Sequence, residues 1–131
     1  IKSRKKNFKY IYEKLKSHEE FLILPEATKN SDPSWFGFPI TLRDNTSITR
    51  TELLRYLDKK KIGTRLLFSG NATKQPYMLQ KKFRTVGNLN NTSTIMSNTF
   101  WIGVYPGLNQ KLGTLLVVGG FHATNRQWSE S

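Results

Sequence analysis

TRTELLRYLDKKKIGTRLLF, from Thr49 to Phe68, is the stretch that decides the fold, because it holds a clearly bounded helix and the strand that follows it. Thr49 and Glu52 have the T-x-x-E spacing of a capping box, in which two side chains satisfy free amide groups of the first helical turn. Gly63 has the position of a helix stop, and the apolar run from Arg65 to Phe68 predicts a strand after a minimal connection. Four apolar side chains form the face that this helix is expected to bury: Leu53, Leu54, Leu57 and Ile62.

The other elements follow from the same periodicity, taken outward from this unit. We expect a helix over residues 3–17, strands over 21–24, 34–42 and 100–104, and a short helix over 92–98. Pro39 has no N–H to give to a sheet, so the strand over 34–42 is expected to lie at an edge or to be bulged there. Short runs with hairpin-length spacing favour an α+β fold, with a short antiparallel sheet packed with helices.

A candidate binding site overlaps the end of this unit, in residues 61–77, KIGTRLLFSGNATKQPY. Arg65 enters the strand, and the polar loop Ser69-Gly70-Asn71 that follows has no evident packing purpose. A fixed cation, a side-chain amide and backbone N–H donors placed close together suit an anionic or polyhydroxylated ligand. The alternative is an ordinary strand followed by a solvated turn.

Two aromatic stretches are also richer than a strand requires. The first, Trp35 to Pro39, gathers three aromatic rings around one glycine, which would let a backbone or a ligand approach closely. The second runs from Phe100 to Gly107, FWIGVYPG, and has the same character. Packing in the core explains both stretches without any ligand.

The charge of the chain bears on its partners. A chain of 131 residues suits one domain, and a formal charge of +12 points toward nucleic acid or another anionic surface. The excess is spread along the chain, however, and its two local clusters, 4–6 and 59–61, fall on expected helices, where lysines are usually solvated. The sequence has no aromatic-basic RNP pattern, no GxxG loop between helices and no Cys/His finger. Because of the charge, a stand-alone basic nucleic-acid-binding module stays an alternative, although none of these motifs supports it.

A complete active site is not visible in the sequence. There is no cysteine, and His18 and His122 are too far apart in the chain to suggest a metal site. None of the nine acidic residues has the spacing of a catalytic pair, and the polar loop lacks the G-K-S/T ending of a Walker motif. No apolar run approaches the roughly 20 residues that span a membrane, so we expect a cytoplasmic protein without a membrane partner. Because the chain begins at Ile1, we expect it to be a piece of a longer protein.

Four stretches together carry a family resemblance: RKKNF at 4–8, LPEATKNSDPSWFGFPITL at 24–42, KKIGTRLLFSGNATKQPY at 60–77 and NTSTIMSNTFWIGVYPGL at 91–108. Over roughly residues 3–109 the chain resembles the C-terminal part of the DegT/DnrJ/EryC1/StrS family of sugar aminotransferases. Within that family it looks most like the NDP-4-keto-6-deoxyhexose 3-dehydrases of lipopolysaccharide and O-antigen deoxysugar biosynthesis. Ordinary aminotransferases of the family usually carry a His-Tyr strand where this chain has Arg65 to Phe68.

This resemblance implies that residues 1–109 are the small C-terminal domain of a fold type I pyridoxal-phosphate enzyme. The dehydrase branch uses pyridoxamine phosphate to remove the C3 hydroxyl of a CDP-4-keto-6-deoxyhexose, and some members also need a [2Fe–2S] cluster and a partner reductase. The cofactor, a His that acts as the base and the cluster would all be bound upstream, so no catalytic residue and no metal ligand is expected here. The full-length enzyme is expected to be a homodimer.

By the same resemblance, this chain would form the substrate side of the pocket. Contacts to the nucleotide sugar are expected from Arg65 and from the loop of Ser69, Gly70 and Asn71, with Gln75 and Trp35 as weaker candidates. A sugar aminotransferase of the same family is the alternative, and a Lys in place of the His at the upstream cofactor position would mark it.

The tail from residue 110 departs from the family pattern. Family members continue past the PGL motif into an amphipathic helix, whereas residues 110–131 contain three glycines, each of which costs a helix interior about 1 kcal/mol. We therefore treat 110–131 as an atypical tail and hypothesise a shifted reading frame or a truncated gene. Sequencing of the locus tests this hypothesis, and an intact frame that encodes the same tail would contradict it.

Overall fold

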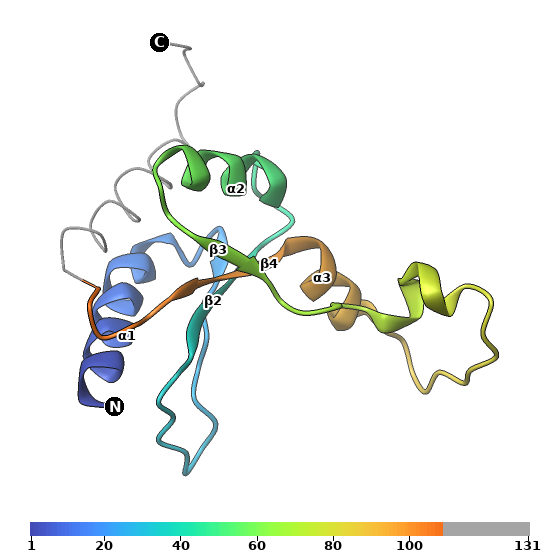
Figure 1. Cartoon of the computed structure of the whole chain (residues 1–131), viewed down its shortest axis with the longest axis horizontal. Helices are drawn as coiled ribbons and strands as arrows, with labels where there is room; N and C mark the ends of the chain where they lie inside the picture. The colour runs from blue at the N-terminus through green and yellow to red at the C-terminus, as the bar shows by residue number, and fades with distance from the viewer. Residues whose placement is uncertain (109–131) are drawn as a thin grey trace.

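Helices and strands alternate along residues 1–108, the part of the chain that the computed structural model describes (Figure 1). Their bounds are α1 (Lys2–Leu15), β1 (Leu22–Ile23), β2 (Gly37–Leu42), α2 (Arg50–Lys59), β3 (Thr64–Leu66), α3 (Asn90–Asn98) and β4 (Thr99–Gly103). Single turns of 3₁₀ helix lie at Lys16–His18, Ala72–Lys74 and Pro76–Met78. This order confirms the predicted succession of elements. Within the described residues, no helix is long and apolar enough to cross a membrane.

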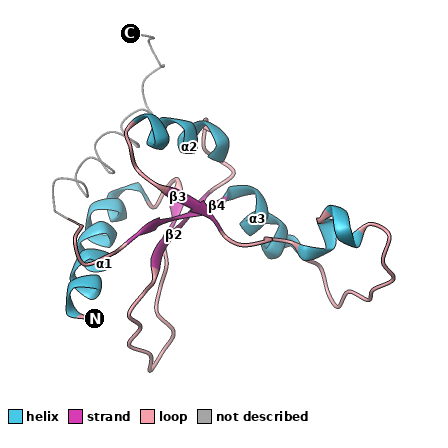
Figure 2. Ribbon diagram, in the orientation of Figure 1, coloured by secondary structure: helices cyan, strands magenta, loops and turns pink. Residues whose placement is uncertain are grey.

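The strands of the described chain form one sheet in the order β1-β2-β4-β3, and every neighbouring pair is antiparallel. The longest pairing joins β2 to β4, from Gly37 opposite Gly103 to Thr41 opposite Thr99. β4 comes last in this part of the chain, yet it lies between β2 and β3, so it joins the two halves of the sheet (Figure 2). The predicted antiparallel sheet is confirmed.

Pro39 lies in an inner strand, at a position where the strand has a hydrogen-bonded neighbour on one side only. β1 pairs only with the end of β2, at Thr41 and Leu42. At Pro39, therefore, β2 is paired on its β4 side alone, opposite Trp101. The expected edge position is wrong for the strand as a whole, which lies between β1 and β4, but the proline itself lies where one side of the strand is unpaired.

The core lies between the sheet and the two longer helices. Alternation along the strands puts Phe38 and Ile40 of β2 and Phe100 of β4 on one buried face. The helices add four side chains to the same cluster: Ile11 and Leu15 from α1, and Leu53 and Leu57 from α2. Because α1 and α2 both pack on this face, the opposite face of the sheet is left uncovered by them.

Helix α2 begins as the sequence predicts. The Thr49 hydroxyl accepts a hydrogen bond from the Glu52 amide at 3.3 Å, and the Glu52 carboxylate accepts one from the Thr49 amide at 2.7 Å. Both halves of the capping box are therefore present. The face expected to be buried is confirmed. Leu53, Leu57 and Ile62 are buried, and Leu54 is half-buried.

The expected helix stop at Gly63 is wrong. The residue with a left-handed backbone is Lys61, whose φ is 61°. The amide of Ile62 donates to the carbonyl of Leu57 at 2.9 Å, and the amide of Lys61 donates to the carbonyl of Asp58 at 2.8 Å. These two bonds define a Schellman motif. Since Ile62 and Leu57 are both buried, their packing in the core stabilises a turn that usually takes glycine.

The strand expected from Arg65 to Phe68 is also corrected. β3 ends at Leu66, and Phe68 has a φ of 47° with 92% of its surface exposed. The amide of Phe68 donates to the carbonyl of Leu66 at 3.0 Å, so the chain turns sharply where the apolar run had suggested a continuing strand. Three apolar residues in a row do not reveal such a turn.

Residues 67–89, which we call the arm, lead from β3 to α3 and project away from the sheet (Figures 1 and 2). The 3₁₀ turns at Ala72–Lys74 and Pro76–Met78 give the arm its local shape. Several large apolar side chains along it are exposed: Phe68, Tyr77, Leu79, Phe83 and Val86. Apolar side chains gathered on one projecting segment are typical of an interaction surface.

Candidate functional site

The predicted loop Ser69–Asn71 lies at the base of the arm, against α3. Gly70 has a φ of 60°, and a side chain at this position would overlap both the side chain and the Cα of Met96. The left-handed backbone and the close approach to α3 both require glycine. Gly70 is therefore fixed by the fold, whatever ligand the loop binds.

Asn71 joins this loop to α3 through its side chain, which is almost fully buried. Its Oδ1 accepts hydrogen bonds from the amide and the hydroxyl of Thr73, at 3.1 and 2.6 Å. Its Nδ2 donates to the Ser93 hydroxyl at 3.1 Å. With these partners, the side-chain amide has one N–H left for any further contact.

Gln75 and Ser69 are brought together by a direct hydrogen bond. The Nε2 of Gln75 donates to the backbone oxygen of Ser69 at 2.6 Å. Ser69 is exposed, and Gln75 is half-buried. The two residues form a polar rim beside Gly70, so four of the six predicted site residues lie in one place.

Arg65 lies close by in the chain, on β3. It is exposed, and its register partner on β4 is Trp101. Side chains at directly opposite positions in antiparallel strands point to the same face of the sheet. Arg65 and Trp101 therefore share the face that α1 and α2 leave uncovered.

Trp35 is not brought to the loop. Its ring stacks on Phe8 of α1, with the ring centroids 5.1 Å apart and the planes 9° from parallel. Phe8 in turn packs against the buried Phe38, at a centroid distance of 4.7 Å. α1 and the arm lie at opposite ends of the molecule in Figure 1. These contacts correspond to the core-packing alternative for this stretch.

The glycine of the same stretch makes room for a side chain of the protein itself. A Cβ on Gly37 would overlap the Trp101 ring, so the indole lies directly over Gly37. Phe36 packs against this indole at a centroid distance of 5.2 Å and is 71% exposed. The Arg4 guanidinium lies 5.8 Å from the Phe36 ring centroid. Sequence reasoning missed this pair of rings because only the register between β2 and β4 shows that they meet.

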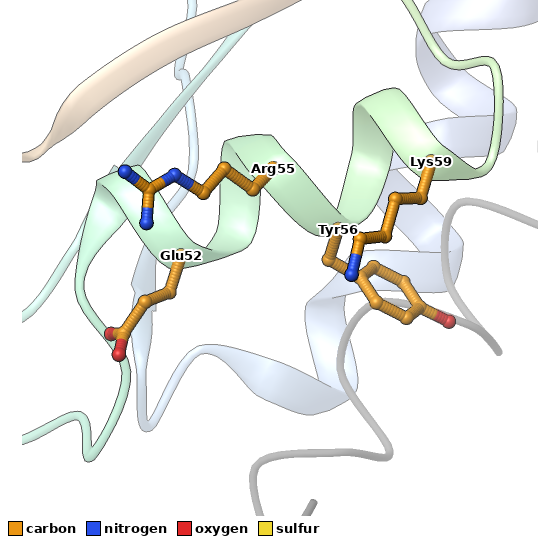
Figure 3. A pocket seen from close by; sticks show the side chains of 4 residues that line it. All are labelled: Glu52, Arg55, Tyr56 and Lys59. Atoms are coloured by element: carbon orange, nitrogen blue, oxygen red, sulfur yellow. The ribbon is translucent and has the colours of Figure 1, made fainter. Parts of the chain in front are cut away.

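Several surface grooves of the described residues form without any of the predicted site residues, and two of them involve α2. One, of about 380 Å³, lies on the exposed face of α2, where Figure 3 shows its lining of Glu52, Arg55, Tyr56 and Lys59. The other, of about 330 Å³, lies where the connection from β2 to α2 meets the end of α3. Across it, the Asn98 Nδ2 donates to an Asp44 carboxylate oxygen at 3.0 Å, which joins the two segments.

Arg50, which lines the second groove, secures the end of α3. Its Nη1 donates to the carbonyl oxygens of Met96 and Thr99, at 2.5 and 3.1 Å. A cation at these carbonyls also interacts favourably with the helix dipole. Burial lowers the pKa of the Arg50 guanidinium, but an arginine keeps its charge at any ordinary pH. Arg50 therefore stabilises the segment to which the Asn71 loop is attached.

A metal site and a pyridoxal-phosphate site both need particular side chains close together. Among residues 1–108, no three His, Cys, Asp or Glu side chains gather closely enough to hold a metal ion. Lysine and acid occur together in the α2 groove, as Lys59 and Glu52, but Glu52 is engaged in the capping box on an exposed helix face.

Known proteins match this chain over most of its length. The model of the DegT/DnrJ/EryC1/StrS aminotransferase family matches residues 1–114. The chain is 58% identical over 108 residues to the lipopolysaccharide biosynthesis protein RfbH of Salmonella typhimurium, a match that covers 82% of this chain and 25% of RfbH. It is 43% identical over 110 residues to the dTDP-4-dehydro-2,6-dideoxy-D-glucose 3-dehydratase of Saccharopolyspora spinosa. This match covers 84% of this chain and 24% of that enzyme. The chain thus spans about a quarter of the length of these relatives.

Solved structures share the fold. The Escherichia coli GDP-4-keto-6-deoxy-D-mannose-3-dehydratase with bound hydrated PLP matches with a TM-score of 0.81 at 24% identity, over 92% of this chain and 30% of that one. A DegT/DnrJ/EryC1/StrS aminotransferase from Brucella abortus matches with a TM-score of 0.75 at 14% identity, over 95% and 31%. These structures confirm the predicted fold class, a small α+β part of a fold type I enzyme.

The sequence matches and the structural matches agree with each other, and both cover the helices, the sheet and the arm. A family model that matches residues 1–114 covers far more than half of the chain. A relative at 58% identity covers 82% of it. This chain belongs to the DegT/DnrJ/EryC1/StrS aminotransferase family.

Proposed function

We propose that this chain is the substrate-side C-terminal part of a pyridoxamine-phosphate-dependent nucleotide-sugar 3-dehydratase of deoxysugar and O-antigen biosynthesis, and that it is inactive alone. The observation that carries this proposal is the 58% identity to RfbH over 108 residues. The next relatives, at 43% and 30% identity, are both named as 3-dehydratases. Sugar aminotransferases such as that of Brucella abortus share only the fold, at 14% identity.

In this proposal, residues 1–109 orient a nucleotide sugar. Arg65 is exposed and binds a phosphate of the substrate, because a guanidinium presents parallel N–H donors that match phosphate oxygens. The exposed Ser69 hydroxyl and the Gln75 amide bind sugar hydroxyls from the rim beside Gly70. The contacts of Asn71 support a role in holding this rim in place.

The chemistry itself is assigned to the rest of the enzyme. The cofactor, a His that acts as the base and any [2Fe–2S] cluster with its partner reductase would belong to the part that this chain does not include. A homodimer in the cytoplasm completes the proposal. The hydrated PLP bound to the Escherichia coli relative supports a pyridoxal-type cofactor for the full-length enzyme.

A chimaeric enzyme tests the proposal. Residues 1–108 of this chain replace the matching quarter of the Salmonella relative, which keeps its own continuation after that point. With a CDP-4-keto-6-deoxyhexose, pyridoxamine phosphate and the partner reductase, we expect C3 deoxygenation at a rate comparable to that of the parent. Amine transfer from glutamate to C4 in place of deoxygenation would instead assign the chain to a sugar aminotransferase.

Two matched variants complete the design. A second chimaera carries residues 109–131 of this chain in place of the parental continuation, and we expect it to be inactive if the tail is foreign to the domain. In the first chimaera, Arg65→Ala is expected to raise KM for the nucleotide sugar more than it lowers kcat, because a phosphate contact is made equally in the ground state and the transition state. A folded, cofactor-loaded first chimaera without either activity would contradict the proposal.

A further inference from the structure

The uncovered face of the sheet carries a pair of rings, the exposed Phe36 and the half-buried Trp101, which we call the aromatic step. The two ring planes meet at 58°, with centroids 5.2 Å apart. Phe36 is 71% exposed, although it lies directly before a strand whose alternate side chains are fully buried. The aromatic step is thus a corner formed by two tilted rings in contact, on the face of the sheet opposite the core.

The geometry of the aromatic step is fixed by the residues that surround Trp101 on the sheet. Trp101 lies over Gly37, where any side chain would overlap its ring. On the same face, the Thr41 and Thr99 hydroxyls hydrogen-bond to each other at 2.7 Å, two residues from Trp101 along β4. Trp101 is also held between the register partners Pro39 and Arg65 on its two neighbouring strands. A platform held in this way binds a flat ligand with little loss of conformational freedom.

Arginines lie on both sides of the aromatic step. Arg4 is 5.8 Å from the Phe36 centroid, and Arg65 is directly across from Trp101 on β3. Side chains in such register positions have Cβ atoms roughly 5 Å apart, so Arg65 reaches a group that projects from a ligand on Trp101. From residue 59 to residue 108 the sequence contains no acidic residue at all. The part of the chain that supplies Trp101 and Arg65 therefore has a charge that suits an anion.

We propose that the aromatic step binds the base of a nucleotide, while Arg65 binds its phosphate. A base in the angle between the rings contacts one ring face-on and the other edge-on, which are the two favourable aromatic geometries. Stacking of this kind tolerates any base, and the flanking arginines supply the phosphate contact that a purely apolar partner would not use. This proposal rests on the proposed function and names the subsite that would hold the nucleoside part of the substrate.

The test uses the complete 131-residue chain and three probes, CDP, GDP and dTDP, with inorganic pyrophosphate as the baseless control. Binding is followed by NMR at the indole N–H of Trp101, which is assigned by its loss in Trp101→Phe. We expect all three nucleotides to shift this signal and pyrophosphate to leave it in place. Phe36→Ala is expected to weaken nucleotide binding on the order of tenfold.

Matched variants separate stacking from folding and charge. Phe83→Ala removes another exposed ring, in the arm, and is expected to leave the dissociation constant unchanged. Arg65→Ala is expected to weaken CDP and pyrophosphate alike, whereas Arg55→Ala on α2 affects neither. Equal effects of Phe36→Ala and Phe83→Ala would overturn the proposal, as would a Trp101 shift caused equally by pyrophosphate.

The outcomes also separate this proposal from the proposed function. Nucleotides that perturb residues 69–75 but not Trp101 would overturn the base subsite and leave the substrate role of the loop intact. The absence of any nucleotide binding, or self-association that Phe36→Ala abolishes, would likewise overturn the base subsite. The chimaeric enzyme decides the dehydratase assignment independently of these results.

Discussion

The helix-covered sheet and the arm hold similar side chains in opposite ways. Phe38 and Phe100 are fully buried in the sheet, whereas Phe68 in the arm is 92% exposed. Burial of apolar side chains determines the shape of the sheet. At the base of the arm, the Asn71 hydrogen bonds and the close fit of Gly70 to α3 have that role. The comparison indicates that stability resides in the sheet, while the arm leaves large apolar side chains exposed.

The largest expected effect separates a buried ring from an exposed one. Phe38→Ala is expected to lower the free energy of unfolding by about 3–5 kcal/mol, through lost burial and the cavity left behind. Phe68→Ala is expected to change it by no more than about 0.5 kcal/mol. Urea denaturation of both variants measures the difference, and Phe38→Leu supplies a milder step if Phe38→Ala does not fold. Similar losses of stability for Phe38→Ala and Phe68→Ala would contradict the comparison.

The next effect concerns the polar base of the arm. Asn71→Ala is expected to cost about 1–3 kcal/mol, because it leaves half-buried partners at Thr73 and Ser93 without their hydrogen bonds. Limited proteolysis is expected to cut the arm faster in this variant, with the sheet still protected. Asn91→Ala, at an exposed position of α3, is the control. An arm that resists the protease equally in both variants would show that Asn71 does not hold it.

A smaller effect is expected at the start of α2. Thr49→Ala removes half of the capping box and is expected to cost about 1 kcal/mol near neutral pH. The hydrogen bonds from Thr49 lower the pKa of Glu52 from its ordinary value of 4.5. The folded state therefore binds fewer protons than the unfolded state in that range, so this contribution is present above the ordinary pKa and is lost as the pH falls through the lowered one.

Denaturation at several pH values checks the sign of this effect. The difference in stability between the native sequence and Thr49→Ala is expected to narrow as the pH falls below the ordinary pKa of Glu52. Thr51→Ala, at the exposed second residue of α2, is the matched control and is expected to show no such narrowing. A difference that grows toward acid pH would contradict the role of the capping box.

The smallest effect tests how α2 ends. Lys61→Gly is expected to raise the free energy of unfolding by about 0.5 kcal/mol, since relief of the left-handed backbone outweighs the added freedom of the unfolded chain. Gly63→Ala is also expected to be neutral or to stabilise by up to about 1 kcal/mol, because its φ is not positive and no atom lies near the new Cβ. Thermal unfolding of the two variants measures the change in stability. A large loss of stability for Gly63→Ala would indicate that Gly63 does end the helix.

Periodicity and capping made most of the fold predictable. The order of elements, the antiparallel pairing and the start of α2 at Thr49 all follow from local patterns, and the structure confirms each of them. These features depend on burial and on hydrogen bonds between near neighbours. The tail over 110–131 lies outside the described residues, so the boundary at residue 109 and the frameshift hypothesis stay predictions.

One error and one omission share a physical cause, since both depend on how a residue packs against segments far apart in the sequence. Lys61 adopts the left-handed backbone because Ile62 is buried against the core, and nothing in the letters around Gly63 shows this. The meeting of Phe36 with Trp101 depends on strand register alone. The grouping of Ser69 to Gln75 was predictable because these residues are neighbours in the chain.

The closure of the arm at its base bears on how enzymes of this family diversify. Gly70 against Met96, and Asn71 bonded to Ser93, join the outgoing and returning ends of the segment. Arg50 secures the returning end to α2. When the ends of a loop are already joined, doubling its length costs only about 0.6 kcal/mol. Insertions beyond these joints and beyond Gln75 would therefore leave the sheet and the base of the arm folded, so the outer part of the arm can change in length without loss of the domain.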